Sequence, residues 1–384
     1  MSSQLPPLPD IEKITPFVTR ILGGNPGKLT TSSHSGTNSY LLGSPNSSDY
    51  ILIDTTSEYA RAPWFKRLTS CLPPPPATTN ITLLLTHHHA DHIGGVPILR
   101  SLYPSLKVYK LRSSNSDSTE QGDQGTYNIA PYESIHQNQT WHIPGVLSVR
   151  AILTPGHTDD HVCFVLSTPT NTNTNTNPNN SSSSNNIPLA ETTTIQETPI
   201  AIFTGDTILG HGTAVFSSLK SYIHSLSYLH DLFTSYSSSL STNHPIPIPA
   251  YPAHGAMIPD GASRAKEYIT HRQEREDQVL NTLRGNFTSF PSSSSSNDKD
   301  DKKKLKESRG ERMTAREIVE TVYQDVEVAL HDAAERGVRQ ILEKLELEGV
   351  VGRARAGDAE EGWEVLDMSV GGDGNEQGKG KGSL

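Results

Sequence analysis

The stretch Thr86-His87-His88-His89-Ala90-Asp91-His92 follows the apolar run 81–85 and precedes Ile93-Gly94-Gly95. A short β-rich run that ends in His-x-His-x-Asp-His is typical of a buried strand that delivers three imidazoles and a carboxylate to its carboxyl end. These groups suit Zn²⁺ and similar divalent cations, and ligands packed this closely can serve two ions. The alternative is an accidental, solvated histidine cluster. The strand before the stretch and the glycine pair after it favour a metal site.

The composition favours a folded core with polar insertions. The chain has 384 residues, 33% of them hydrophobic, and Ser, Thr, Asn and Pro concentrate in a few segments. This length suits one large domain or two smaller ones. The formal net charge of −10 disfavours a dedicated nucleic-acid binder, which usually has a basic surface, but it does not exclude a local basic patch.

The cysteines and the first residues bear on the cellular compartment. Cys71 and Cys163 have neither the spacing of a disulfide framework nor that of a cysteine metal site. The first residues lack a basic region followed by an apolar one, and no apolar run reaches membrane-spanning length. We therefore expect a soluble cytoplasmic protein with no membrane partner. A mitochondrial location is less favoured, because the start is not an Arg-rich amphipathic segment.

Apolar patterning predicts strands and helices around the histidine stretch. Strands are expected at 14–22, 38–43, 50–54, 81–85, 107–110, 147–153, 161–167 and 200–203, and helices at 59–72, 96–103, 219–236 and 262–283. The histidine stretch lies between a strand and a helix, which is a usual position for functional residues in α/β folds.

Three further segments place a histidine or an aspartate in a turn. His157 lies in the turn 154–160, Asp206 ends a strand after Gly205, and His254 follows Tyr-Pro-Ala. Loops at the carboxyl ends of strands converge, so ligands that are distant in the sequence can meet. Taken singly, each residue has an ordinary alternative as a surface histidine or a turn-capping aspartate. Their joint occurrence with residues 86–92 favours one site.

Together these motifs resemble the metallo-β-lactamase superfamily over roughly residues 14–283. The matching pattern is Thr-His-x-His-x-Asp-His at 86–92, Pro-Gly-His-Thr at 155–158, Gly-Asp at 205–206 and Pro-Ala-His-Gly at 252–255. The resemblance implies an α/β fold, the αββα sandwich, with two divalent metal ions, Zn²⁺ or Mn²⁺. It implies that one ion is held by His87, His89 and His157, the other by Asp91, His92 and His254, and that Asp206 bridges both.

The resemblance also narrows the chemistry. Class B β-lactamases lack the bridging aspartate, whereas thioesterases, glyoxalase II enzymes and nucleases of the superfamily have it, so Asp206 disfavours antibiotic hydrolysis. Asp54, at the end of a predicted strand, matches a family aspartate that orients the histidine loop; its alternative role is that of a plain turn residue.

A dinuclear site implies a hydrolase. Two divalent cations held close together lower the pKa of a bridging water toward neutrality and aim the resulting hydroxide at a carbonyl carbon or a phosphorus. Asp91, a ligand that touches this nucleophile, is the candidate for accepting or shuttling its proton. Asp91 and Asp206 are therefore the predicted catalytic residues. We find no Ser-His-Asp or Cys-His arrangement with convincing context.

Within the superfamily the chain resembles the lactamase-β-like subgroup. This subgroup includes fungal polyketide-cluster thioesterases, which release acyl chains from a carrier protein, and an animal mitochondrial endoribonuclease that cuts single-stranded RNA. The resemblance is carried by residues 21–27, 36–40, 205–213, 251–255 and 271–276, and by a carboxyl-terminal segment like the subgroup's winged helix. These motifs do not separate the two chemistries.

We favour hydrolysis of an acyl thioester, with an acyl carrier protein as the expected partner. The acidic balance argues mildly against RNA, whose binding is mostly phosphate neutralisation, and no aromatic and basic stripe suited to stacking single strands is visible. The basic run 302–304 suits either partner, or is a solvated linker. Single-stranded RNA cleavage remains the alternative. A third hypothesis is a non-catalytic metal-binding scaffold, which the complete set of predicted ligands disfavours.

Composition also predicts domain limits. We expect a leader at 1–13, a metallo-β-lactamase domain at 14–285 with a disordered insertion at about 168–198, a linker at 286–312, a winged-helix-like helical domain at 313–368 and a disordered tail at 369–384. In the helical domain, Thr314 resembles a helix N-cap, helical spacing continues to Leu345, and Gly349 is the expected stop.

Overall fold

The computed structural model describes most of the chain. The described residues are 7–24, 36–44, 47–73, 79–113, 129–170, 196–241, 244–285, 312–323, 327, 331–354 and 361–366. The chain divides into two compact units, Met1–Ile269 and Thr270–Leu384. Residues 171–195 of the predicted insertion, 286–311 of the predicted linker, with its basic run, and the predicted tail lie outside the described residues, so the predicted domain limits remain predictions.

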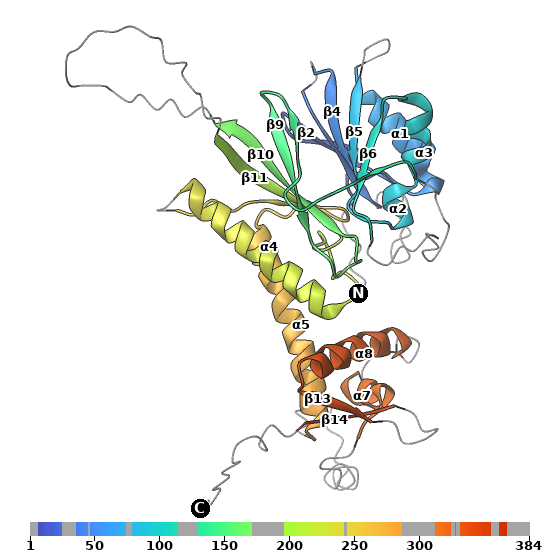
Figure 1. Cartoon of the computed structure of the whole chain (residues 1–384), viewed down its shortest axis with the longest axis vertical. Coiled ribbons are helices and arrows are strands. Elements are labelled where there is room, and N and C mark those ends of the chain that lie inside the picture. Colours follow the sequence, from blue (N-terminus) through green and yellow to red (C-terminus); the bar gives the residue numbers. More distant parts are fainter. Residues whose placement is uncertain are drawn as a thin grey trace, which may run out of the picture. The chain divides into compact units, whose positions relative to one another are not determined.

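The first unit contains two facing β-sheets (Figure 1). The strands of the first sheet, in spatial order, are β1 (Ile11–Thr15), β2 (Val18–Leu22), β3 (Asn38–Leu42), β4 (Asp49–Ile53), β5 (Asn80–Leu84), β6 (Lys107–Lys110) and β7 (Glu133–Ser134). Pairing is antiparallel from β1 to β4 and parallel from β4 to β7.

The second sheet is antiparallel except at one edge. Its strands, in spatial order, are β12 (Ala250–Pro252), β11 (Gln196–Gly205), β10 (Val162–Thr170), β9 (Leu147–Leu153) and β8 (Thr140–Ile143). Only β11 and β12 run parallel. The carboxyl ends of these two strands therefore lie at the same edge of the sheet, which is where the chain places two of the predicted metal ligands.

Helices cover the outer face of each sheet (Figure 1). Against the first sheet pack α1 (Arg61–Ser70) and α3 (Val96–Leu102), preceded in the chain by the short helices η1 (Glu58–Ala60) and α2 (Ala90–Ile93). Against the second sheet pack α4 (Leu219–Leu240) and the first turns of α5 (Gly261–Leu283). This arrangement confirms the predicted αββα sandwich.

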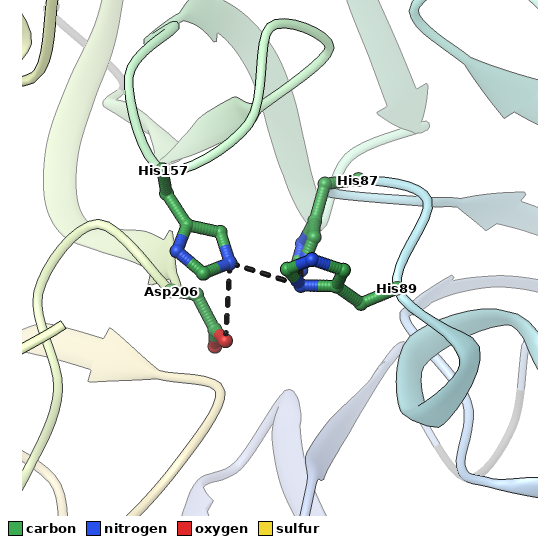
Figure 2. Close-up of side chains that lie close together, drawn as sticks. All are labelled: His87, His89, His157 and Asp206. Atoms are coloured by element: carbon green, nitrogen blue, oxygen red, sulfur yellow. Dashed lines mark hydrogen bonds and ion pairs between the residues drawn. The ribbon is translucent and has the colours of Figure 1, made fainter. Parts of the chain in front are cut away.

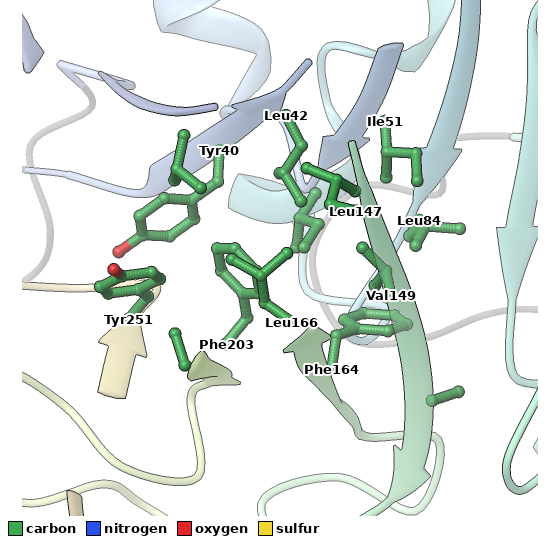
Figure 3. Close-up of a cluster of buried hydrophobic side chains, with 14 of the residues drawn as sticks. Tyr40, Leu42, Ile51, Leu84, Leu147, Val149, Phe164, Leu166, Phe203 and Tyr251 are labelled. Atoms are coloured by element: carbon green, nitrogen blue, oxygen red, sulfur yellow. The ribbon is translucent and has the colours of Figure 1, made fainter. Parts of the chain in front are cut away.

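The core between the sheets follows from the alternation of side chains along each strand. In β10, Phe164 and Leu166 face the other sheet, whereas Cys163 and Val165 face α4. Both faces of the strand are therefore buried, which explains its continuous apolar sequence. Figure 3 shows the inner cluster, in which the ring centroids of Tyr40 and Phe203 lie 5.0 Å apart. Each large apolar side chain in such a core contributes about 1.5–3 kcal/mol of burial free energy.

One sequence prediction needs correction. The single strand expected at 14–22 is a hairpin of β1 and β2, joined by a turn at Pro16 and Phe17; proline has no N–H with which to continue a strand ladder. The carboxyl-terminal domain, predicted as winged-helix-like, also contains two strands that the apolar pattern did not locate, β13 (Val351–Ala354) and β14 (Gly362–Val365), which pair antiparallel.

The second unit contains α7 (Ala315–Val322), α8 (His331–Leu347) and the β13–β14 hairpin, a winged-helix arrangement. The predicted helix start at Thr314 is confirmed, because Thr314 and Glu317 form a reciprocal capping box. The predicted stop is also confirmed: Gly349 has a φ of 73°, and the N–H of Val350 reaches back to the Leu345 carbonyl. In the described part of the chain, no helix has the length and apolarity needed to cross a membrane.

Candidate metal centre

The structure brings all seven predicted ligands to one place. The histidine stretch follows β5 of the first sheet, and His157 lies in the turn between β9 and β10. Asp206 follows β11, and His254 follows β12. Four loops, which follow β5, β9, β11 and β12, thus meet, as expected for loops at the carboxyl ends of strands.

The first group of ligands, His87, His89 and His157, consists of three imidazoles that converge on one point (Figure 2). His87 Nε2 lies 2.8 Å from His89 Nδ1, and His157 Nε2 lies 3.0 Å from the same atom. The side chain of His157 is almost fully buried, and His87 is completely buried. We call these three residues the first half of the site.

The second group combines a carboxylate with two imidazoles. Asp91 Oδ2 lies 3.5 Å from His92 Nε2 and 3.3 Å from His254 Nε2. The Asp91 side chain is 32% exposed, so it is the most accessible carboxylate of the site, whereas His92 is fully buried. We call Asp91, His92 and His254 the second half.

Asp206 lies between the two halves and offers one oxygen to each. Its Oδ2 is 3.5 Å from His157 Nε2 in the first half, as Figure 2 shows. Its Oδ1 is 3.4 Å from His254 Nε2 and 3.7 Å from His92 Nε2 in the second half. This is the arrangement required of a carboxylate that bridges two cations.

Asp54 fixes the orientation of ligands in both halves. Its Oδ2 accepts hydrogen bonds from His92 Nδ1 and from Thr86 Oγ1, at 2.9 and 2.8 Å, and its Oδ1 accepts one from the Thr86 amide at 2.8 Å. Because the Thr86 hydroxyl donates to Asp54, it can only accept from His87 Nδ1, which lies 2.9 Å away. Both imidazoles therefore carry their proton on Nδ1 and present Nε2 to the site.

Two further features hold the first half. His157 Nδ1 donates to the Val215 carbonyl at 2.7 Å, so His157 also presents Nε2. Gly156, just before it, presses against α4: a Cβ on Gly156 would lie 2.3 Å from the Cα of Tyr222. Its φ of 139° is also in the region that favours glycine. The Ser217 amide, two residues before α4, donates to the Gly156 carbonyl at 2.7 Å.

Burial keeps two imidazoles of the first half, those of His87 and His89, neutral. It lowers the pKa of His87 well below the usual value, and the nearby His92 acts in the same direction. Burial, together with His157, lowers the pKa of His89 to about 4. Near pH 7 these imidazoles are therefore ready to bind a cation without losing a proton.

The second half holds protons instead. Burial lowers the pKa of His254, but Asp206 and Asp91 override this effect and raise it to about 10. Burial is likewise overridden at His92, whose pKa is raised by Asp91 and Asp54. Burial would raise the pKa of both site carboxylates, but the two imidazolium charges hold it well below the usual value.

The donor set fits a pair of divalent cations. The atoms His92 Nε2 and Asp206 Oδ1 are buried and have no hydrogen-bond partner among the described residues. Buried polar atoms without partners are rare and imply a missing ligand or ion. Imidazole nitrogens and carboxylate oxygens are the ligands that Zn²⁺ and similar cations take. The ligand atoms within each half lie within 4.8 Å of one another.

Several residues that position the site were not singled out from the sequence. Thr37 Oγ1 donates to Asp91 Oδ2 at 2.8 Å. His161, fully buried, accepts the Asp206 amide proton on Nε2 at 3.0 Å. A Cβ on Gly205 would lie 2.5 Å from this nitrogen, so the chain before Asp206 passes over the His161 ring at a distance that only glycine allows. Thr37 lies in the quoted motif 36–40, whereas His161 directly follows the quoted turn 154–160 and was counted as the start of the next predicted strand.

Comparisons with known proteins agree with this geometry. Residues 34–169 match the model of the metallo-β-lactamase superfamily, and residues 314–363 match that of the β-lactamase-associated winged-helix domain. The fold resembles that of a β-lactamase domain protein from Burkholderia ambifaria, with a TM-score of 0.60, 14% identity and coverage of 95% of this chain and 96% of that one. It also resembles a metallo-β-lactamase family protein from Thermus thermophilus, with a TM-score of 0.54, 17% identity and coverage of 92% and 100%.

Curated relatives match nearly the whole chain. An atrochrysone carboxyl ACP thioesterase from Passalora fulva is 33% identical over 375 residues, covering 96% of this chain and 87% of the relative. The lactamase-like protein adaB from Aspergillus niger is 32% identical over 352 residues, covering 91% and 86%. With the αββα fold and the two converging ligand groups, these matches show that the chain belongs to the metallo-β-lactamase superfamily.

Proposed function

We propose that this metal-dependent hydrolase cleaves acyl thioesters, and that its substrate is an acyl chain carried by an acyl carrier protein. The observation that carries the proposal is the similarity, over 96% of the chain, to a relative that is an acyl carrier protein thioesterase. The position of Asp206 between two ligand groups supports it, because a pair of cations held there would supply an activated water for attack on the thioester carbonyl. We propose zinc as the metal and the cytoplasm as the compartment.

The site residues and the bound cations have separate roles in the proposed reaction. When bound, two divalent cations supply an activated water and stabilise the charge that develops on the carbonyl oxygen. The water oxygen adds to the thioester carbonyl carbon, the C–S bond breaks, and the products are a carboxylate and a thiol. Asp91 is placed to take the proton lost by the water, since its side chain is 32% exposed and can pass the proton to solvent. Thr37 holds Asp91 Oδ2, which leaves Oδ1 for this task.

Charges in the second unit favour a thioester over RNA. Three arginines of the winged-helix domain are paired with acidic side chains of the same domain: Arg316 with Asp332 at 2.9 Å, Arg339 with Glu335 at 2.7 Å, and Arg353 with Glu346 at 2.7 Å. Phosphate binding requires cations that are available to the nucleic acid. In the described part of this domain these arginines are already neutralised.

The test offers both substrates side by side. Purified protein loaded with Zn²⁺ or Mn²⁺ is given an acyl thioester on a carrier protein, a small N-acetylcysteamine thioester and a single-stranded RNA. We expect thioester hydrolysis that falls by about three orders of magnitude in Asp206→Ala, since metal activation supplies several kcal/mol. RNA cleavage that is lost in the same variant, with the thioesters untouched, would replace this proposal by the endoribonuclease alternative.

Metal content tests the scaffold alternative. The ions bound per chain are counted by mass spectrometry after zinc is supplied and excess metal removed. We expect two ions per chain. Fewer than one, together with no hydrolysis of any substrate, would make the protein a non-catalytic scaffold.

A further inference from the structure

A third polar cluster lies beside the metal centre and contains none of its seven predicted ligands. His88, the middle member of the three consecutive histidines, lies with its Nδ1 2.9 Å from Asp160 Oδ1. Thr158 Oγ1 donates to the same oxygen at 2.7 Å. The other carboxylate oxygen, Oδ2, lies 2.7 Å from Lys110 Nζ. We call His88, Thr158, Asp160 and Lys110 the brace.

The brace is built around a charge that water does not reach. Asp160 is fully buried, and the Lys110 side chain is only 7% exposed. Burial would raise the pKa of Asp160, but the hydrogen bond from His88 and the charge of Lys110 hold it well below the usual range. A buried carboxylate is tolerated only when it is paired and hydrogen-bonded. His88 and Asp160, with the neighbouring Asp159, have ligand atoms within 4.8 Å of one another, but Lys110 already balances the charge of Asp160, so we interpret the brace as a support and not as a further metal site.

The connections of the brace are specific to the first half. His88 lies between His87 and His89, and Thr158 directly follows His157. One oxygen atom, Asp160 Oδ1, therefore ties together the two loops that carry all three imidazoles of the first half. Lys110 is the last residue of β6, so it anchors the Asp160 carboxylate to the first sheet. The ligands of the second half have other supports: Thr37 holds Asp91, and Asp54 holds His92.

We propose that the brace sets the spacing of His87, His89 and His157, so that Asp160, which is not a ligand, is a positioning residue that determines the metal affinity of the first half alone. Residues that hold metal ligands in place typically change metal affinity by about 10- to 100-fold. The proposal uses the metal binding assumed in the proposed function but not the substrate. A failure of thioester hydrolysis would leave it standing.

The experiment measures zinc binding rather than turnover. Metal-free full-length protein is titrated with Zn²⁺ in competition with a chromophoric chelator, and two binding steps are fitted. His89→Ala and His254→Ala identify the steps, because each removes one ligand from one half. His88→Leu is the main variant: the His88 side chain is 43% exposed, so its loss leaves the buried Asp160–Lys110 pair in place. His88→Gln keeps a hydrogen-bond donor, and Asp231→Asn is the matched control, at an exposed carboxylate of α4 that is not part of the brace.

We expect His88→Leu and Thr158→Val each to weaken the first-half step by about 10-fold or more, and Asp160→Asn by up to about 100-fold, with the second-half step unchanged. We expect His88→Gln to stay within about threefold of the parent, as a donor is retained, and Asp231→Asn to match the parent. Equal weakening of both steps, or unchanged affinities alongside a lower melting temperature of the metal-free protein, would show that the brace is only structural and would overturn the proposal.

Discussion

The two halves of the site are built from different chemistry on the same framework. The first half contains His87 and His89, which burial keeps neutral, and the second has two imidazoles that hold protons between Asp91 and Asp206. A cation entering the first half displaces no proton from His87 or His89. A cation entering the second half must displace at least the proton of His254, whose pKa is about 10. The difference teaches that one fold can make two adjacent metal positions respond differently to pH, although they share Asp206.

Removing one predicted ligand from one half at a time should have the largest effect on zinc binding, and it tests whether the two halves bind their ions separately. Zinc sites with four protein ligands bind with roughly 12 kcal/mol, so one ligand represents about 3 kcal/mol, or more than about a hundredfold in affinity. We expect His89→Ala to lose the ion of the first half and His254→Ala that of the second. Competitive zinc titration of both variants measures this. If either variant lost both ions together, the halves would be one cooperative site.

The pH dependence of zinc binding should also differ between the two halves. Because the pKa of His254 is about 10 and that of His92 is also raised in the metal-free protein, second-half affinity should rise by at least about tenfold per pH unit between about pH 6 and about pH 8. First-half affinity should stay flat, since the pKa of His89 is about 4. Calorimetry in buffers of different ionisation enthalpy counts the protons released. Equal proton release at both steps would contradict the assignment.

The raised pKa of His254 makes zinc affinity rise with pH, but it makes the stability of the metal-free protein fall with pH. The folded pKa of His254 lies above its usual value of 6.5, so the pairing with Asp91 and Asp206 stabilises the fold fully below that pH. This contribution is lost as the pH rises through about 10. We expect the melting temperature of the metal-free protein to fall over this range, and zinc to remove most of the fall. A melting temperature that rises with pH would contradict this.

Substituting the residues that hold the predicted ligands should affect the two zinc-binding steps less selectively than removing a ligand. Asp54 contacts His92 directly and His87 through Thr86, so Asp54→Asn should weaken both binding steps by about 10- to 100-fold. Thr37 donates its hydroxyl to Asp91, and its backbone pairs with that of His254, which also belongs to the second half. Thr37→Val removes the hydroxyl hydrogen bond, of about 1 kcal/mol, and should weaken the second step about fivefold. Zinc titration of both variants compares them. An effect of Thr37→Val on the first step would show that the halves share this support.

The smallest effect is expected from a change in the second unit, which contains none of the predicted ligands. Thr314→Ala removes the capping box of α7 and should destabilise the second unit by about 1 kcal/mol. Both zinc-binding steps should stay at the parent values. Denaturant unfolding and zinc titration of this variant provide the check, and a change in either step would link the winged-helix domain to the metal centre.

The sequence was sufficient for the parts of the site that local patterns specify. His87, His89, Asp91 and His92 share one loop after one strand, and the turns of His157, Asp206 and His254 each follow a strand. The sandwich could be expected for the same reason. Residues such as Asp160 and His161 could not be placed, because their roles arise only when two loops pack together. Strands β13 and β14 could not be located from the sequence because they are short and have little apolar alternation. The β1–β2 hairpin was not predicted because the apolar pattern continues on both sides of Pro16.

The close approach of Gly156 to α4 has a consequence for observing the site. The His157 loop and the start of α4 share the hydrogen bond from the Ser217 amide to the Gly156 carbonyl, and no side chain fits between Gly156 and Tyr222. Any restraint on the His157 imidazole is therefore transmitted to the Ser217 amide, whose exchange with deuterium requires that hydrogen bond to open. Deuterium uptake at Ser217 thus reports occupation of the first half by metals that have no colour or magnetism of their own.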